Sequence, residues 1–338
     1  MAMTIYDISK KAGVSIATVS RVLNGSENVR PSTRKKVMDV IDKYDYTPNA
    51  FARGMGLHSL KTIGILCADS SDLFLAKAVY FLEQELQANG YESLLCCTGY
   101  NLDIKKNYLN LILSKKVDSI ILVGSNFIGS TEDENQYIKD VSTQVPIMLL
   151  SASFDYPNVY STLCDDYGTM FEATTEMIQA GITDILYLYD SKSYSGLKKL
   201  HGFRDAMKEH NIPGFEKLIH FYDGNIEHLD EIADFVAGIA KKGSSFHGIM
   251  TSDDSLAIGS IKYAQKKGIR IPEDLSVMGY NNSMLTNCCT PELTSVDNRL
   301  ETQTHQLVQT LLGVLAGEEM PKKSIFSGKI IKRGTTLF

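Results

Sequence analysis

The spacing of apolar residues divides the chain into two parts that meet near residue 60. In the first part, apolar residues recur at every third or fourth position, which predicts short helices at 5–12, 16–24 and 31–44. In the second part, short apolar runs alternate with amphipathic stretches, a pattern typical of doubly wound parallel sheets. We therefore expect an all-α unit followed by a larger α/β domain.

The first two predicted helices are bounded by strong end signals. Thr4 and Asp7 have the spacing of a capping box at the start of the first helix. Gly13 suits a left-handed helix end, and Ser15 is a good N-cap for the second helix. Two helices joined by a three-residue turn that contains glycine indicate a helix-turn-helix, whose second helix enters the major groove of DNA.

The second predicted helix has two unlike faces. Val19, Val22 and Leu23 form an apolar stripe that would be buried. The opposite face is small and polar, and it consists of Ala17, Ser20, Arg21 and Asn24. Arg21 could pair in bidentate fashion with a guanine edge, while Ala17 is small enough for close approach to a thymine methyl. The alternative is an ordinary amphipathic helix with one solvated arginine.

The third predicted helix completes a small core and is followed by a hinge. Pro31 suits the first helical position, and the apolar stripe that follows consists of Val37, Val40, Ile41 and Tyr44. Four basic residues lie at its start: Arg30, Arg34, Lys35 and Lys36. Pro48 then breaks the helix, and Asn49 can cap a short new one. We expect a headpiece over 1–46, a hinge helix and linker over 47–60, and a large domain over 61–338.

Charge is distributed unevenly between these parts. The 338-residue chain has a net charge of −6, yet residues 1–60 hold nine Lys/Arg and five Asp/Glu, which is a net +4. The basic headpiece is therefore the part with an electrostatic attraction to phosphate. A secretory signal and an apolar run of transmembrane length are both missing from the sequence, so we expect a cytoplasmic protein without a membrane partner.

The cysteines give no sign of a metal centre or of disulfides. The six cysteines form no CxxC motif and have no accompanying histidine spacing, so neither a zinc site nor a disulfide framework is expected. We interpret most of them as buried thiols at strand ends. No metal or cofactor is expected.

The large domain is predicted to contain two successive sets of strands with helices between them. The first set is predicted at 62–67, 93–97, 119–123 and 146–150, and the second at 159–163, 185–189, 217–221, 248–251 and 275–278. The helices include 73–88, 103–114, 132–141, 255–267 and 300–316, and a last strand is expected within 332–338. Each set would form one lobe, and ligands would bind beyond the carboxyl ends of the strands, in the cleft between the lobes.

Four sequence motifs carry a family resemblance. They are Thr4-Ile-Tyr-Asp-Ile, Ala12-Gly-Val-Ser, Ala17-Thr-Val-Ser-Arg-Val-Leu-Asn and Pro48-Asn-Ala-Phe-Ala-Arg. Together they resemble the lactose-repressor/galactose-repressor family of bacterial transcription regulators. The stretch Val29-Arg-Pro-Ser-Thr-Arg-Lys-Lys-Val makes the headpiece most similar to the catabolite-control branch of that family.

The resemblance implies how the headpiece would bind DNA. A homodimer would bind a pseudo-palindromic double-stranded operator, with one headpiece on each half-site. Base contacts would come from Ile16, Ala17 and Arg21 on the second helix, and Ser20 on the same helix would also contact DNA. Phosphate or base-edge contacts would come from Thr4, Tyr6, Asn24 and Arg30. Ala52 and Met55 would be the minor-groove elements of the hinge helix, where Met55 replaces the leucine that usually wedges the central base step.

The same resemblance implies a two-lobed domain with a periplasmic-binding-protein-like fold. The first lobe would comprise about 61–159 and 292–320, and the second about 160–291 and 321–338. The chain would cross between lobes near Tyr160, Pro291 and Pro321, so that the helix at 300–316 returns to the first lobe.

Candidate effector-binding residues follow the predicted strands. They are Asp69, Ser71, Phe74, Ser125 and Ser151 in the first lobe, Asp190, Lys199, Asp253 and Asn281 in the second, and Asn298 in the returning segment. Three positions depart from the family pattern: Lys199 replaces an arginine, Asn281 replaces an aspartate, and Gly224 replaces an aromatic residue. A free sugar bound in the usual way is therefore not expected, which leaves a phosphorylated sugar or another anion at Lys199, or no small-molecule effector.

Two alternatives to a small-molecule-controlled repressor remain at this stage. The pair Asp253-Asp254 could support acid/base chemistry in a sugar- or nucleotide-modifying enzyme with an appended headpiece, although the same pair suits the start of a helix. A phosphorylated carrier protein is a possible partner, but the segment around Cys288 and Cys289 offers no basic group for a phosphoserine. We predict a transcriptional repressor that is not an enzyme and responds to a sugar, a sugar phosphate or a related metabolite.

Overall fold

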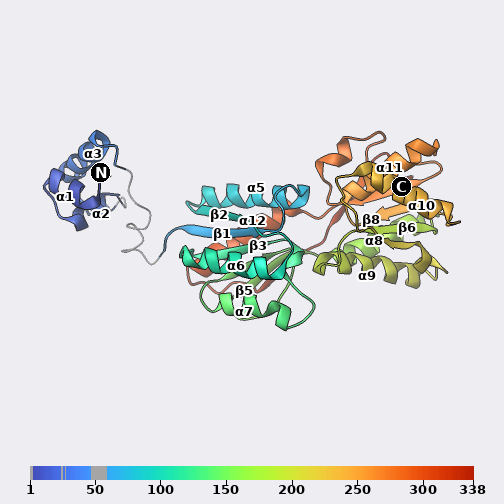
Figure 1. Cartoon of the computed structure of the whole chain (residues 1–338), viewed down its shortest axis with the longest axis horizontal. Helices are drawn as coiled ribbons and strands as arrows, with labels where there is room; N and C mark the ends of the chain where they lie inside the picture. Colours follow the sequence, from blue (N-terminus) through green and yellow to red (C-terminus); the bar gives the residue numbers. More distant parts are fainter. Residues whose placement is uncertain (1–2, 24–25, 27, 47–58) are drawn as a thin grey trace.

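The computed structural model describes residues 3–23, 26, 28–46 and 59–338. They form a small helical headpiece and a two-lobed α/β domain (Figure 1). The headpiece contains α1 (Ile5–Ala12), α2 (Ile16–Leu23) and α3 (Pro31–Lys43), close to the predicted ranges. The predicted hinge, including Ala52 and Met55, lies outside the described residues.

The first lobe is built on a six-stranded parallel sheet. The strand order is β11-β5-β4-β3-β1-β2, and all neighbouring strands in this sheet pair in parallel. The strands are β1 (Thr62–Cys67), β2 (Glu92–Cys97), β3 (Ser119–Val123), β4 (Ile147–Leu150), β5 (Val159–Cys164) and β11 (Lys323–Phe326). The central strands β1, β3 and β4 are buried along almost their whole length, because helices cover both faces of the sheet.

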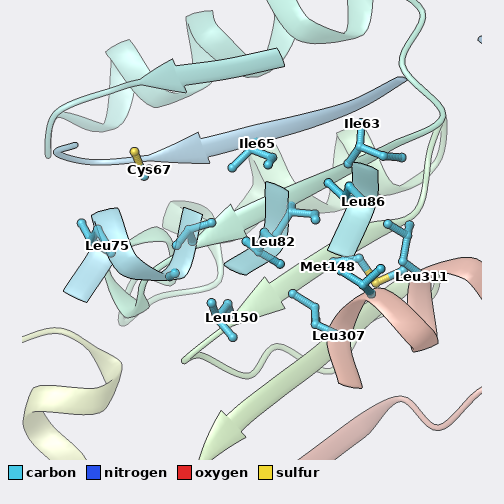
Figure 2. Close-up of a cluster of buried hydrophobic side chains, with 14 of the residues drawn as sticks. Ile63, Ile65, Cys67, Leu75, Leu82, Leu86, Met148, Leu150, Leu307 and Leu311 are labelled. Atoms are coloured by element: carbon cyan, nitrogen blue, oxygen red, sulfur yellow. The ribbon is translucent and has the colours of Figure 1, made fainter. Parts of the chain in front are cut away.

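Two helices cover each face of this sheet. On one face, Leu82 of α5 (Leu73–Ala88) and Leu307 of α12 (Leu300–Leu315) pack against Ile63 and Met148 of the strands (Figure 2). The other face is covered by α6 (Leu102–Ser114) and α7 (Gln136–Ser142), with the short turns η1 (Ser125–Phe127) and η2 (Asp133–Asn135) between them. α12 therefore returns to the first lobe as predicted.

The second lobe repeats this plan with one antiparallel strand. Its strand order is β12-β10-β9-β8-β6-β7, and β12 pairs antiparallel with β10. The strands are β6 (Ile185–Tyr189), β7 (Ile219–Phe221), β8 (Gly248–Thr251), β9 (Ser276–Tyr280), β10 (Thr294–Asp297) and β12 (Lys329–Ile331). The last strand thus precedes the predicted one at 332–338, whose Thr335 instead caps the ends of β9 and β10 through hydrogen bonds with Val277 and Thr294.

The helices of the second lobe also pair by face. α8 (Asp166–Gln179) and α9 (Tyr194–Glu209) share one core, and α10 (Leu229–Lys241) and α11 (Asp254–Lys267) share the other. The lobe also contains η3 (Phe215–Leu218) and η4 (Met284–Asn287). Gly202 allows α8 and α9 to approach closely, because a Cβ atom there would lie 2.3 Å from the carbonyl oxygen of Tyr167.

The three crossings between lobes come later in the chain than predicted. β5 belongs to the first sheet, so the chain leaves the first lobe after Cys164 instead of near Tyr160. β10 belongs to the second sheet and β11 to the first, which moves the other two crossings beyond Asp297 and Phe326. Each crossing comes later because the strand just before it still pairs within the lobe that the chain is about to leave. The predicted lobe boundaries at 159/160, 291/292 and 320/321 are therefore each several residues too early.

Candidate functional site

The headpiece has a core formed by all three helices. Ile8, Val19, Val22, Val37 and Ile41 are buried in it. The predicted capping box is present, because the Asp7 amide donates to the Thr4 hydroxyl and the Thr4 amide donates to the Asp7 carboxylate. The Thr4 hydroxyl also donates to the Asp7 carboxylate, and the hydrogen bonds from the Thr4 hydroxyl and amide lower the pKa of Asp7. The start of α1 is thus fixed by local chemistry that needs no tertiary contact.

The turn between α1 and α2 also follows its predicted chemistry. Gly13 has a φ of +66°, and its amide donates to the carbonyl of Ser9. The Ser15 hydroxyl accepts from the Thr18 amide at 3.1 Å, so Ser15 caps α2. One prediction for the core is wrong: Tyr44 is 38% exposed, and its ring lies 4.4 Å from the Lys11 ammonium instead of among the apolar side chains.

The structure places most candidate DNA-binding residues on the headpiece surface. Ile16, Ala17 and Arg21 are exposed on α2, while Ser20 is half-buried. Tyr6 is 68% exposed on α1, and Arg30 is exposed at the start of α3. Thr4 is exposed, but its hydroxyl is hydrogen-bonded to Asp7 at 2.6 Å. Asn24, Ala52 and Met55 lie outside the described residues.

One member of the basic cluster has a structural partner. Arg34 is half-buried, and its guanidinium donates to the carbonyl oxygen of Ser26 at 2.6 Å, which ties α3 to the loop that follows α2. Lys35 and Lys36, by contrast, are exposed on α3. The positive surface that remains is suited to contact phosphates, which position a reading helix without carrying sequence information.

Two adjoining cavities in the cleft between the two lobes contain the candidate residues, and a third cavity of about 650 Å³ lies beside them, with Lys77 and Arg299 in its lining. The inner cavity has a volume of about 150 Å³ and is lined by residues that follow β3, β4, β6, β8 and β9. The outer cavity has a volume of about 540 Å³. Asp72, Phe74, Tyr100, Asp190 and Asp253 line both cavities. Together they are large enough for a ligand of the size of a mono- or disaccharide.

All ten candidate effector-binding residues line these cavities. Eight line the inner cavity, namely Phe74, Ser125, Ser151, Asp190, Lys199, Asp253, Asn281 and Asn298. Asp69 and Ser71 line the outer cavity. They come together because the carboxyl ends of both parallel sheets point at the cleft.

Polar side chains connect the two lobes across the cleft. Ser125 of the first lobe donates to the hydroxyl of Ser193, the N-cap of α9, at 2.8 Å. Asn298 donates to Asn281 at 3.0 Å, and Asn281 donates to Asp253 at 2.8 Å. Asn281 thus uses both ends of its amide within the protein, which an aspartate at this position could not do.

Acidic side chains dominate the cleft. Burial and the nearby Asp190 and Asp254 raise the pKa of Asp253 to about 7, although its carboxylate accepts a hydrogen bond from the Ser255 amide. Burial also raises the pKa of Asp72. Asp190 accepts a hydrogen bond from the Ser252 hydroxyl at 2.8 Å. A positive charge or a hydrogen-bond donor on a ligand would stabilise these carboxylates in their ionised form.

Lys199 is held inside the second lobe. Its ammonium donates to the carbonyl oxygen of Ser252 at 3.0 Å and lies 3.9 Å from the centre of the Tyr280 ring. The buried Asp166 is held close by, because it accepts from the hydroxyls of Tyr280 and Ser195 at 2.6 Å each. Burial raises the pKa of Asp166, and the positive charge of Lys199 offsets part of this rise. The lysine therefore balances the charge of Asp166 within the lobe.

The predicted carboxylate pair does not act as a pair in the cleft. Asp253 caps α11 and lines the cavity, as the helix-start interpretation predicts. Asp254 is 1% exposed and turns to the other side, where it accepts from the Ser295 hydroxyl and the Ser283 amide. Two adjacent carboxylates that point apart cannot share one substrate bond.

Several lining residues were missed by sequence reasoning. Asp166, Ser195 and Gln303 line the inner cavity, and Tyr100 lines both cavities. Tyr100 and Asp166 follow β2 and β5, so the rule that binding residues follow strands could have found both of them. Gly224 lacks room for a side chain, because a Cβ atom there would lie 2.4 Å from the hydroxyl oxygen of Tyr222. Phe74 and Tyr100 provide the aromatic surface instead.

Two further properties concern the described residues alone. The described side chains include no group of three or more His, Cys, Asp or Glu arranged to hold a metal ion. None of the described helices combines the length and the apolar character needed to span a membrane. Of the six cysteines, Cys67 and Cys164 are buried, while Cys97 and Cys288 are exposed, so the expectation that most are buried is wrong.

Comparisons with known proteins agree with both parts of the structure. Residues 4–49 match the model of bacterial regulatory proteins of the lacI family, and residues 174–336 match a periplasmic binding protein-like domain. An HTH-type transcriptional regulator of Lachnoclostridium phytofermentans is 50% identical over 99% of this chain and 100% of its own length. Catabolite control protein A of Priestia megaterium is 33% identical over 88% of this chain and 87% of its own length.

A solved structure supports the fold over the whole length. The lac repressor dimer bound to operator and the anti-inducer ONPF superimposes with a TM-score of 0.88 at 21% identity, covering 100% of both chains. The headpiece, the two-lobed domain and the full-length relatives lead to one assignment: the chain belongs to the LacI family of bacterial regulatory proteins.

Proposed function

We propose that this DNA-binding transcriptional regulator is a repressor whose affinity for a pseudo-palindromic operator is controlled by a small molecule in the interlobe cleft. The observation that carries the proposal is the exposed face of α2, where Ile16, Ala17 and Arg21 project from a basic three-helix unit. In a helix-turn-helix, this is the face that reads base edges in the major groove. Thr4, Tyr6 and Arg30 would contact the backbone or base edges.

The proposed effector is a hydroxyl-rich molecule of the sugar class without a phosphate group. The inner cavity is lined by Asp72, Asp166, Asp190 and Asp253, and carboxylates accept hydrogen bonds from hydroxyl groups. Lys199, the residue that the sequence suggested for an anion, is already engaged with Ser252 and Tyr280. A phosphate placed among these carboxylates would be repelled, so a sugar phosphate is disfavoured.

We propose that the regulator acts as a homodimer. Leu73 and Tyr80 of α5 are 42% and 53% exposed, and Leu94 and Leu95 of the edge strand β2 are 38% and 44% exposed. These exposed apolar side chains of the first lobe support an interaction surface there. The lac repressor, which shares the fold, was solved as a dimer on its operator, and two headpieces would match two operator half-sites.

Ligand binding would act through the relation between the lobes. The cavities are lined from both lobes, so a ligand there favours the lobe arrangement in which it makes the most contacts. In a dimer, a change in lobe arrangement would alter the spacing of the first lobes and of the hinges that lead to the headpieces. This step lets a small molecule change DNA affinity without touching DNA.

Two experiments test the proposal. Selection from a random duplex library with the full chain should yield an inverted repeat, and a reporter gene placed behind that repeat should be repressed. Failure to enrich any inverted repeat at moderate salt would contradict the DNA-binding role. An Asp253→Asn variant should keep operator affinity and change only the response to effector. Turnover of a candidate sugar by the wild type, lost in this variant, would instead support the enzyme alternative.

A further inference from the structure

Three carboxylates from both lobes converge on the two cavities. Asp72 begins α5 in the first lobe, while Asp190 and Asp253 follow β6 and β8 in the second, and all three line both cavities. They are close enough to affect one another, since Asp190 raises the pKa of Asp72 and both raise the pKa of Asp253. Asp69 and Glu227 add two more carboxylates around the outer cavity.

Positive charge does not balance this group. Lys199 is the one basic side chain among the described residues that line the two cavities. Its ammonium is committed to the Ser252 carbonyl oxygen and to the ring of Tyr280, and its charge offsets that of the buried Asp166. Helix starts also contribute, because the Leu75 and Ser255 amides donate to Asp72 and Asp253. The pKa values of Asp72 and Asp253 stay raised despite these hydrogen bonds.

An independent observation is that, among the described residues, three side-chain amides lining the inner cavity have unpaired atoms, which are the nitrogen of Asn126 and the oxygens of Asn298 and Gln303. The described residues offer no hydrogen-bond partner to the amide oxygens of Asn298 and Gln303, although these side chains are 5% and 1% exposed and line the inner cavity. The amide nitrogen of Asn298 donates to the side-chain oxygen of Asn281, and the amide nitrogen of Gln303 donates to the backbone carbonyl oxygen of Asn298. A buried acceptor without a donor costs about 1–3 kcal/mol, which a ligand with donor groups would recover.

We propose that the effector is a hydroxylated amine, such as an amino sugar, whose protonated amino group lies among Asp72, Asp190 and Asp253. Its hydroxyl groups would donate to the amide oxygens of Asn298 and Gln303. Phe74 and Tyr100, which line both cavities, supply aromatic surface that also attracts a cation. This inference rests on the proposed role of the cleft as the effector site and narrows the chemical class of the effector.

An organic ammonium fits these residues better than a metal ion or an anion. The described residues contain no His, Cys, Asp and Glu group arranged to hold a metal, so the three carboxylates do not converge on one coordination point. An ammonium is less demanding, because its acceptors lie about 2.7–3.2 Å from the nitrogen and it does not require a complete coordination shell. An anion would add to the repulsion among the carboxylates.

Matched pairs of sugars test the inference on the full-length protein. Glucosamine, galactosamine and mannosamine would each be compared with its parent hexose and its N-acetyl derivative, which lacks the positive charge. Dissociation constants would be measured by calorimetry and thermal shift without DNA, at pH 7.5 and equal ionic strength. At least one amine should bind about tenfold or more tightly than both of its neutral counterparts, the gain expected for a charge-assisted hydrogen bond.

Two variants locate the effect. Asp72→Asn should reduce the amine-to-neutral affinity ratio to near one, and the helix start should survive because asparagine is also a good N-cap. Asp223 is exposed and lines neither cavity, so Asp223→Asn should leave the ratio unchanged. An equal loss in both variants would overturn the assignment, since it would indicate a general effect of protein charge.

The outcomes separate this inference from the proposed function. If no amine binds more tightly than its neutral counterparts, the amine inference is overturned, whereas a neutral sugar that binds and changes operator affinity would still support the proposed function. If an amine binds with the expected preference and operator affinity does not change, the ligand class stands and the proposed control of DNA binding fails.

Discussion

The hydroxyl oxygens of Ser125 and Ser193 lie 2.8 Å apart, and this hydrogen bond joins the first lobe to the second. Ser193 also accepts a hydrogen bond from Ser191, which belongs to the same lobe, at 2.8 Å. Ser193 is moreover the N-cap of α9, so its position is fixed by the helix. The contact across the cleft therefore depends on where η1, which contains Ser125, stands relative to α9.

Ser125→Ala should shift the ligand-free protein toward an open cleft. The variant removes a hydrogen bond between lobes worth about 0.5–1.5 kcal/mol, so the ratio of closed to open forms should fall roughly two- to tenfold. Small-angle X-ray scattering should show a larger radius of gyration. Ser191→Ala is the matched control, because it removes a hydrogen bond to the same Ser193 hydroxyl within one lobe. An identical radius of gyration in wild type and Ser125→Ala would contradict the prediction.

The raised pKa of Asp253 predicts a pH-dependent stability. Its folded-state pKa of about 7 lies above the ordinary value of 3.8, so the folded protein binds this proton more tightly than the unfolded chain does. The resulting stabilisation is fully present below pH 3.8 and is lost as the pH rises through 7. Asp253→Asn should therefore raise the unfolding temperature at pH 8 by several degrees, and by less at pH 5. About 1 kcal/mol corresponds to roughly 2–4 °C in a large domain.

The control for this prediction is an aspartate with a shift of the opposite sign. Arg270 lowers the pKa of the exposed Asp274 through paired hydrogen bonds of 2.6 Å, so its stabilising effect is present above pH 3.8. Asp274→Asn should lower the unfolding temperature at both pH 5 and pH 8. Thermal unfolding of the full chain at the two pH values distinguishes the variants. If Asp253→Asn raises the unfolding temperature equally at both pH values, the raised pKa of Asp253 is refuted.

Local chemistry explains why much of the fold was predictable. The predicted bounds of α1 and α5 agree with the structure, because capping residues such as Thr4 and Asp72 mark helix starts in the sequence. The rule that ligand sites follow parallel strands also predicted that Ser125 and Asp253 lie at the interlobe cleft, where both line the inner cavity. These predictions need information from only a few neighbouring residues or from strand order.

The failures have a different physical origin. β11 alternates exposed and half-buried residues and has only four residues, so no apolar run marks it, and its partner β5 is 159 or more positions away in sequence. The partners of Lys199, which are Ser252 and Tyr280, lie on other elements as well. Sequence spacing therefore identified Lys199 as a cavity residue but could not reveal that its charge was already engaged, which changes the expected ligand from an anion to a donor-rich molecule.

Arg21 and Arg30 should have different effects on DNA recognition. Arg21 is exposed on the face of α2 that we propose to read bases, so Arg21→Ala should relax preference at one base position by about 1–3 kcal/mol. Arg30 lies at the start of α3, and Arg30→Ala should weaken binding to all sequences nearly equally and reduce the salt dependence by about one counterion. Fluorescence anisotropy with the selected operator, its single-base variants and random duplex at several salt concentrations measures both effects. If Arg21→Ala weakens binding to all DNA sequences equally, Arg21 does not contact the bases.

Gly13→Ala should weaken the headpiece through backbone strain alone. Gly13 has a φ of +66°, and a Cβ atom there would meet nothing within 4 Å, so steric contact with neighbours is not involved. An alanine in this left-handed conformation costs roughly 1–2 kcal/mol. Gly238→Ala is the matched control, because Gly238 lies inside α10 with equally open surroundings and without a positive φ, and there alanine should stabilise by about 0.5–1 kcal/mol. Hydrogen exchange of the full chain should therefore show faster exchange in α1 and α2 for Gly13→Ala and slower exchange in α10 for Gly238→Ala. Unchanged exchange in α1 and α2 would mean that the turn adopts another conformation at no cost, and operator affinity would then be unaffected as well.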